Sequence, residues 1–280
     1  MDLSIILVNY NTLDLTKACI ESVKKYTNGI DYEVIVVDNN SVDGSKEYFS
    51  QVEGILFIES GANIGFGRAN NIGFKKTKGR YVLMLNSDTV LENNVLTRMV
   101  RHFDEQPQDV ACIGSLLVHA DKKPSYSFGS FVNWKDEFKR SVRPQETRTI
   151  SERQKDVDYV SGADLFVRRS VAEKFGLFDP DFFMYYEDME IGYRYHCHGL
   201  RSVIMNENGI VHLEGASLNN SYRKKSIITR SYMLYLRKTL TRNEFYIAKC
   251  CILMRRLLTV WHYHWSVKDS LRYVFQIVKS

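Results

Sequence analysis

Hydrophobic strand-like runs alternate with short helix-like segments over the first 115 residues, and this alternation constrains the fold more than any other feature. The helix-like segments carry apolar residues at three- and four-residue spacing and end at glycines such as Gly29 and Gly79. Strands that alternate with short helices predict an α/β fold with a mostly parallel sheet and right-handed crossovers. The predicted strands comprise residues 3–8, 32–37, 55–58 and 81–85.

The pattern changes after Gly114. Residues 119–156 are polar and predict a long acceptor-side excursion that closes over or recruits a substrate. Beyond residue 220 the pattern is helical, so we expect one domain over residues 1–218 and a basic helical extension over 219–280. The other predicted elements are an ordered segment at 157–167, a helix at 187–198, an edge hairpin of 202–205 with 210–213, and helices at 227–240, 245–260 and 267–278.

Charge and cysteine content indicate the cellular compartment and the surfaces that the protein contacts. The net charge is +5, and cations concentrate between Tyr222 and Arg256, where Glu244 is the single acid. This segment favours an anionic surface, either phospholipid or a phosphate-bearing substrate, although a solvated helix face explains the same charges. Five cysteines without a CxxC pair indicate a reducing compartment. We expect a cytoplasmic protein that binds no nucleic acid and contacts the inner face of the plasma membrane peripherally through residues 222–260.

A polar triplet, Asn86-Ser87-Asp88, follows the buried run that ends at Leu85. A carboxylate at the carboxyl end of a parallel strand lies where open α/β sheets bind their ligands. Mg²⁺ or Mn²⁺ bound to a diphosphate needs only one or two protein carboxylates, because phosphate oxygens and waters complete its coordination. Asp88 is therefore a candidate metal ligand. The alternative is that Ser87 or Asp88 caps the next helix, around Met99.

Two further polar loops follow predicted strands. Asp38 can accept hydrogen bonds from a ribose or a base, or it can form an Asx-turn before the next helix. Gly65-Phe66-Gly67 matches part of the GxGxxG pattern of dinucleotide-binding folds. Asn70 stands at the third glycine position, however, and the loop follows the third strand rather than the first. A dinucleotide-binding oxidoreductase is therefore the weaker alternative.

An acidic pair, Glu187-Asp188, begins a predicted helix directly after an aromatic run. The helix dipole stabilises acids at this position without any catalytic role. Two adjacent carboxylates beside aromatic rings do not both ionise easily, however, and such a setting tunes one of them as a base. His212, on a later strand, is by itself most simply a structural histidine.

Six short motifs, taken in order, give the chain a resemblance to a known family. They are Ser4 to Asn11, Val36 to Ser41, Asn63 to Gly67, Leu85 to Asp88, Gly176 to Asp179 and Tyr186 to Glu190. Over residues 3–215 the chain resembles the family 2 inverting nucleotide-sugar glycosyltransferases, which have the GT-A fold. It is most similar to the rhamnosyltransferase-like branch, in which an Asn-x-Asp replaces Asp-x-Asp. Here Asn86 occupies the first position, which would leave Asp88 to hold the metal nearly alone.

The resemblance implies a reaction and a set of site residues. The reaction would be a single displacement that moves a sugar from dTDP-rhamnose or a UDP-sugar to a glycan or lipid-linked acceptor, with inversion, in bacterial surface polysaccharide assembly. A nucleotide-sugar-binding assembly partner without turnover is a further alternative. The implied roles are general base for Asp188 with Glu187 beside it, a Mg²⁺ or Mn²⁺ site at Asp88 and His212, the acceptor side at Gly162, Ala163 and Asp164, and donor binding at Asn9, Asp38, Asn40, Asn63, Gly65, Asn70 and Asn86.

Overall fold

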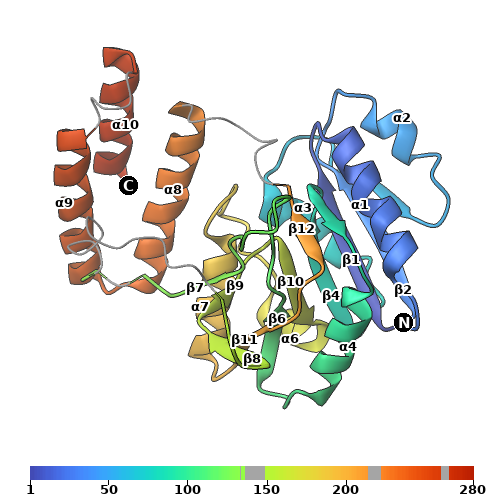
Figure 1. Cartoon of the computed structure of the whole chain (residues 1–280). Coiled ribbons are helices and arrows are strands. Elements are labelled where there is room, and N and C mark those ends of the chain that lie inside the picture. Colours follow the sequence, from blue (N-terminus) through green and yellow to red (C-terminus); the bar gives the residue numbers. More distant parts are fainter. Residues whose placement is uncertain (133, 136–148, 214–221, 260–264) are drawn as a thin grey trace.

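An eight-stranded sheet forms the centre of the protein (Figure 1). The computed structural model describes residues 1–132, 134–135, 149–213, 222–259 and 265–280. The strand order is β3-β2-β1-β4-β10-β6-β11-β8. These strands are β1 (Leu3–Asn9), β2 (Tyr32–Asp38), β3 (Leu56–Glu59), β4 (Tyr81–Asn86), β6 (Val110–Gly114), β8 (Gln154–Val157), β10 (Asp164–Arg168) and β11 (Arg201–Met205).

The pairing confirms the predicted α/β fold with a mainly parallel sheet. Strands β3, β2, β1 and β4 pair in parallel, as do β6 and β11. Only β10 and the edge strand β8 run antiparallel to their neighbours. The four strands predicted in the first 115 residues all form, each within one residue of the predicted ends. Their carboxyl ends therefore meet at one edge of the sheet, with Asn9 opposite Asp38 and Val8 opposite Asn86.

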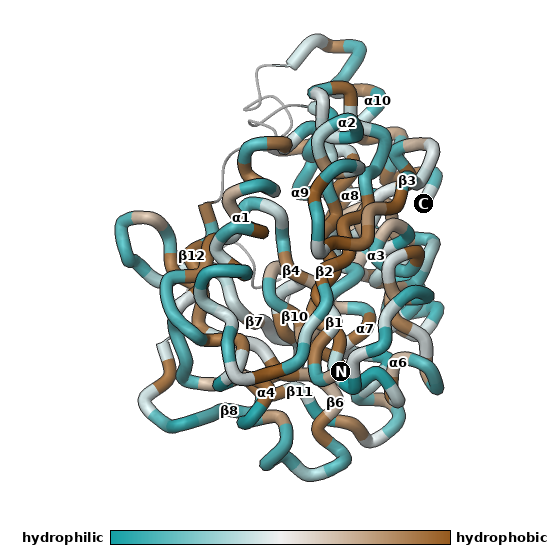
Figure 2. Tube along the Cα trace, turned by 90° about the vertical axis from the view of Figure 1, so that its right-hand side faces the viewer, coloured by the Kyte–Doolittle hydropathy of each residue, from teal (hydrophilic) through white to brown (hydrophobic). Residues whose placement is uncertain are grey.

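Both faces of the sheet are buried because helices cover each of them, and successive side chains of each strand point to opposite faces. In β1, Ile5 and Leu7 belong to one hydrophobic cluster and Ile6 belongs to the other. Figure 2 shows hydrophobic colour along the central strands and hydrophilic colour on many of the outer turns. Helices α1 (Leu13–Tyr26) and α4 (Val95–Glu105) cover the first face; α3 (Phe66–Phe74), α6 (Arg169–Phe175) and α7 (Glu187–Cys197) cover the second; α2 (Ser45–Phe49) is short.

The later strands differ from the predicted edge hairpin of 202–205 with 210–213. β11 lies inside the large sheet between β6 and β8. β12 (Ile210–His212) instead pairs with β5 (Thr89–Leu91) in a separate two-stranded sheet. The predicted excursion at 119–156 also contributes structure, because its last residues begin β8 and because β7 (Phe128–Gly129) pairs with β9 (Tyr159–Val160). Residues 136–148 of the excursion lie outside the described part of the chain.

Three helices follow the sheet, as predicted: α8 (Tyr222–Thr239), α9 (Arg242–Thr259) and α10 (Val267–Lys279). They stand together beside the sheet (Figure 1). A hydrophobic cluster joins them to the rest of the protein, because Tyr232 and Tyr235 of α8 pack with Phe182 and Met189. The predicted boundary between residues 218 and 219 lies outside the described residues. Within the described ranges, each helix is too short or too polar to cross a bilayer.

Candidate active site

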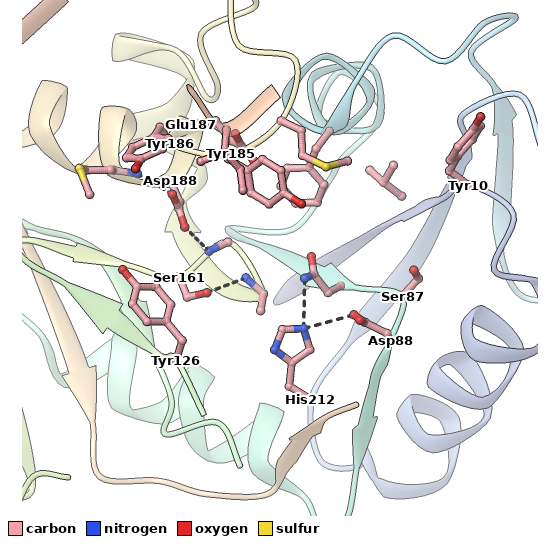
Figure 3. A pocket seen from close by; sticks show the side chains of 18 of the residues that line it. Tyr10, Ser87, Asp88, Tyr126, Ser161, Tyr185, Tyr186, Glu187, Asp188 and His212 are labelled. Carbon is pink, nitrogen blue, oxygen red and sulfur yellow. Dashed lines mark hydrogen bonds and ion pairs between the residues drawn. The ribbon is translucent and has the colours of Figure 1, made fainter. Parts of the chain in front are cut away.

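A cavity of about 570 Å³ opens at the carboxyl edge of the parallel strands. It lies where open α/β sheets bind ligands. Asp88, which follows β4, and Asp188, at the start of α7, both line it. Figure 3 shows the two acids approaching the same space from opposite sides. Two carboxylates more than ninety residues apart in the sequence are thus brought to one cavity.

Asp88 pairs with His212, and a local sheet brings them together. β5 follows Asp88 and pairs with β12, which ends at His212. The Asp88 Oδ1 atom lies 3.3 Å from His212 Nε2. Asn86 Nδ2 lies 3.5 Å from the same nitrogen (Figure 3). The alternative that Ser87 or Asp88 caps the next helix is wrong, because β5 intervenes and α4 has Asn94 at its N-cap.

The Asp88–His212 pair fits a divalent cation. Two ligand atoms that each lie about 2.1 Å from one ion at a right angle are about 3.0 Å apart, close to the observed separation. Within the described residues, no group of three or more His, Cys, Asp or Glu side chains gathers around a metal position. The remaining coordination would therefore come from other ligands such as phosphate oxygens and waters, a common arrangement for Mg²⁺.

The second acid is held by backbone donors. The N–H of Gly162 donates to Asp188 Oδ2 at 3.1 Å, and the N–H of Met189 donates to Asp188 Oδ1 at 2.8 Å. These donors stabilise the ionised form of Asp188.

Glu187 lies deeper than its neighbour and is only 6% exposed. Its Oε2 atom is buried and receives no hydrogen bond from the described residues. Burial, followed by the charge of Asp188, raises the pKa of Glu187 from its ordinary 4.5 to about 8. Burial also raises the pKa of Asp188, but the hydrogen bonds from Gly162 and Met189 oppose that rise. We infer that Glu187 keeps its proton at neutral pH and that Asp188 carries the negative charge.

The wild type is expected to lose stability as the pH rises, and Glu187→Gln is expected to remove this loss. Because the folded-state pKa of Glu187 is raised to about 8, the folded protein retains a proton that the unfolded chain releases above about pH 4.5. Wild-type stability therefore falls, relative to the variant, between pH 5 and pH 8. Thermal unfolding at both pH values measures this, with the exposed Glu173→Gln as control. Equal pH dependence of wild type and Glu187→Gln would contradict the assignment.

Polar loop residues form the other end of the cavity. Asn39 and Asn63 both line it, and Asn39 Nδ2 donates to Asn63 Oδ1 at 3.1 Å. Asn39 Oδ1 accepts from the N–H of Ile64 at 3.0 Å, so the loops after β2 and β3 hold each other. Gly65 has φ +90°, and a Cβ there would lie 2.2 Å from the carbonyl oxygen of Phe183. Only glycine lets the loop after β3 approach the segment before α7 this closely.

Most of the predicted site residues reach the cavity. Those that line it are Asn63, Asn86, Asp88, Gly162, Ala163, Glu187, Asp188 and His212. Gly65 and the exposed Asn40, which has φ +68°, are not among the lining residues. Their predicted contact with the donor stays a prediction.

The side chains of Asn9, Asn70 and Asp164 are buried, and their predicted ligand contacts stay predictions. Asn9 donates to Asp38 Oδ1 at 2.7 Å, and Asn70 donates to the Phe66 carbonyl at 3.1 Å. The Asp164 carboxylate, predicted on the acceptor side, accepts from Ser115 Oγ at 2.6 Å.

Asp38 is 3% exposed, and its carboxylate also accepts from the N–H of Ser41 at 2.9 Å. These hydrogen bonds hold the turn after β2, and the predicted contact of Asp38 with the donor stays a prediction.

None of the aromatic residues that line the cavity is among the predicted site residues. Tyr10, which follows β1, is 42% exposed and lies at one end of the cavity (Figure 3). Tyr126, Tyr159 and Tyr185 line other parts of it, and the hydroxyls of Tyr126 and Tyr159 are hydrogen-bonded. Two signals were available, since Tyr10 directly follows a buried strand and Tyr185 belongs to the aromatic run before the acid pair.

The fold and the cavity together define an α/β protein of the GT-A type, with a metal-capable acid and a buried acid pair at the strand ends. The sequence profile of glycosyl transferase family 2 matches residues 4–176. The chain therefore belongs to glycosyl transferase family 2. This confirms the family inferred from the motifs and excludes the dinucleotide-binding oxidoreductase.

Over much of its length the chain is similar in sequence to proteins named for glycan synthesis. It is 28% identical over 208 residues to the low-salt glycan biosynthesis hexosyltransferase Agl10 of Haloferax volcanii, covering 69% of this chain and 61% of the relative. It is 25% identical over 214 residues to the rhamnosyltransferase WbbL of Escherichia coli K12, covering 70% of this chain and 78% of that relative. Thus the chain spans less than two thirds of the Haloferax protein.

A solved structure shares the fold. GalNAc-T7, crystallised with UDP, GalNAc and Mn²⁺, superposes with a TM-score of 0.63 at 18% identity, covering 84% of this chain and 48% of that one. At this identity the likeness establishes the fold and nothing finer.

Proposed function

We propose that this chain transfers a sugar from a nucleoside diphosphate donor to an acceptor hydroxyl with inversion of the anomeric configuration. The observation that supports this most directly is that Asp88 and Asp188 line one cavity from opposite sides. One acid can lie beside the diphosphate while the other faces the incoming nucleophile. A single displacement needs this opposed arrangement, because the acceptor attacks the anomeric carbon opposite the leaving group.

Asp188 is the proposed general base. Its ionised carboxylate takes the proton of the acceptor hydroxyl, while the N–H groups of Gly162 and Met189 fix its orientation. The acceptor oxygen then forms its bond to the anomeric carbon, and the bond from that carbon to the diphosphate oxygen breaks with its electron pair on the diphosphate. Glu187, which holds its proton, adds no second negative charge beside the base. No covalent glycosyl-enzyme is required.

The donor is proposed to lie along the strand ends. The nucleoside would occupy the end of the cavity lined by Tyr10, Asn39 and Asn63, and its diphosphate would lie beside Asp88 and His212. When bound there by Asp88 and His212, Mg²⁺ or Mn²⁺ would offset the charge of the departing diphosphate. Asn86, in contact distance of His212, would face the same group.

The proposed donor is dTDP-rhamnose or a UDP-sugar, and the acceptor is a glycan or a lipid-linked glycan in surface polysaccharide assembly. The rhamnosyl transfer named for WbbL supports the first donor. The presence of UDP in the GalNAc-T7 structure supports the second. Turnover distinguishes this function from a nucleotide-sugar-binding assembly partner that lacks catalysis.

Nucleotide sugars are expected to raise the melting temperature of the chain selectively. A ligand that binds only the folded state stabilises it in proportion to RT ln(1 + [L]/Kd). A thermal-shift screen of dTDP- and UDP-sugars, with and without Mn²⁺, should identify one donor whose effect Mn²⁺ enhances, with NAD as the negative control. Release of UDP or dTDP from that donor in the presence of glycan acceptors then measures turnover. If a nucleotide sugar binds but no UDP or dTDP is released with any acceptor, the assembly partner without catalysis is favoured. If no nucleotide sugar binds, the proposal is overturned.

A further inference from the structure

The outer helices α9 and α10 leave apolar side chains uncovered. Among the described residues, nine of the sixteen exposed large hydrophobic side chains belong to these two helices. On α9 they lie opposite the buried residues Phe245, Ala248 and Ile252. At about 100° per residue, the charged side chains of α9 all fall outside this apolar half. The exposed apolar residues of α9 are Tyr246, Ile247, Met254, Leu257 and Leu258.

A second apolar stripe lies on α10. Val267, Leu271, Phe275 and Val278 repeat every three or four residues and are all exposed, Leu271 by 64%. The two helices are packed neighbours, since Lys249 of α9 donates to the carbonyl of Val278 at 2.9 Å. The two stripes therefore lie on neighbouring helices.

Cations accompany the apolar stripe of α10. Lys268, Arg272 and Lys279 are exposed and fall along one edge of the stripe at helical spacing. Each of the two helices has one acidic residue, and its side chain is hydrogen-bonded at the start of the helix. Glu244 accepts from Thr241 Oγ1 at 2.7 Å, and Asp269 accepts from Ser266 Oγ at 2.8 Å. Apolar faces edged by cations match an anionic lipid surface, in which acyl chains lie beneath phosphate groups.

The same charges disfavour a second copy of the chain as the occupant. In a symmetric dimer the same patch meets itself, so the cations of one copy would face those of the other. An anionic bilayer surface instead satisfies both features of the patch.

Helix α8 connects this region to the cavity. Ile228 of α8 lines the cavity, and Ser231 Oγ donates to the carbonyl of Met184 at 2.7 Å. The Tyr232 ring lies 5.0 Å from that of Tyr186, the residue before Glu187. Helices α9 and α10 also share a hydrophobic cluster with α8. A surface bound by the outer helices would thus be held at a defined position relative to the catalytic acids.

We propose that the outer faces of α9 and α10 bind an anionic phospholipid surface and so present a lipid-linked acceptor to the cavity. The role in presenting an acceptor rests on the proposed glycosyl transfer, whereas the lipid binding itself does not. The helices would lie in the interface with their apolar faces among the head groups and upper acyl chains.

Vesicle sedimentation of the full chain tests the proposal. The wild type should sediment with phosphatidylcholine vesicles that contain phosphatidylglycerol, less with pure phosphatidylcholine, and less again at high salt. The double variant Leu271→Glu, Phe275→Glu should lose this binding, and Leu56→Glu, at an exposed site on β3, should retain it. Replacing Lys268 and Arg272 by Gln should weaken binding by about 30-fold, at about 1 kcal/mol for each cation near the surface.

Several outcomes would overturn the membrane proposal. They are absence of wild-type binding to anionic vesicles, binding that Leu271→Glu, Phe275→Glu leaves unchanged, and self-association of the wild type that the same variant abolishes. Melting temperature and UDP or dTDP binding are measured for each variant. If the wild type binds nucleotide but not vesicles, only the membrane proposal is refuted. If it binds vesicles but not nucleotide, only the proposed glycosyl transfer is refuted.

Discussion

Asp188→Asn is expected to slow sugar transfer by about 10²–10⁴-fold, the contribution typical of a general base. The amide has nearly the same shape but cannot take the proton of the acceptor hydroxyl. Binding of the donor should persist, because the nucleoside end of the cavity and the Asp88–His212 pair are untouched. Steady-state kinetics should show the loss in kcat, with the donor KM little changed.

The control for this variant is Asp181→Asn. Asp181 directly precedes the aromatic run at residues 182–186, is exposed, and pairs with Lys238 rather than facing the cavity. Its replacement should leave kcat unchanged. Equal melting temperatures and equal nucleotide binding for Asp188→Asn and wild type would show that the fold is intact. Near-normal turnover by Asp188→Asn would refute the assignment of the base.

The parallel core of the fold could be predicted because its strands are hydrophobic on both faces. Each of β1, β2 and β4 is an almost unbroken buried run, so its pattern alone identifies it. Short strands are different. β8 begins with Gln154, Lys155 and Asp156 and forms the sheet edge, so its pairing with β11 rather than its own pattern makes it a strand. The three-residue partners β5 and β12 depend in the same way on a contact between distant segments.

The candidate site was predictable where a polar residue ends a strand or begins a helix. Asp88 lies two residues past the end of β4 and Asp188 is the second residue of α7, and both reach the cavity. Asn9 and Asp38 also end strands, and Asn70 lies in α3, yet the side chains of all three are buried and hydrogen-bond within the protein. Whether such a polar side chain points into the cavity or into the protein depends on backbone geometry that the residue types do not specify.

Asp88→Ala is expected to abolish the stimulation of sugar transfer by Mn²⁺. A metal at a departing phosphate contributes several kcal/mol of charge stabilisation, and each 1.36 kcal/mol corresponds to a tenfold change in rate, so kcat should fall by about 10²–10³-fold. His212 would remain as a single protein ligand, which is too few to hold a cation tightly. Titration of Mn²⁺ against wild type and variant, in the presence of UDP or dTDP, measures the loss of affinity directly.

A paired variant changes the same site in the opposite direction. Asn86 Nδ2 lies 3.5 Å from His212 Nε2, so Asn86→Asp would place a second carboxylate beside the proposed cation position. Tighter Mn²⁺ binding should result, because an anionic oxygen replaces an amide. Glu92→Ala, which removes an acid paired with Lys122 outside the cavity, serves as the control and should change neither affinity nor rate. If Asp88→Ala still responded to Mn²⁺ and Asn86→Asp bound Mn²⁺ no better than wild type, the cation would have to lie elsewhere. Asp88 and His212 would then be only an ion pair that joins β12 to the end of β4.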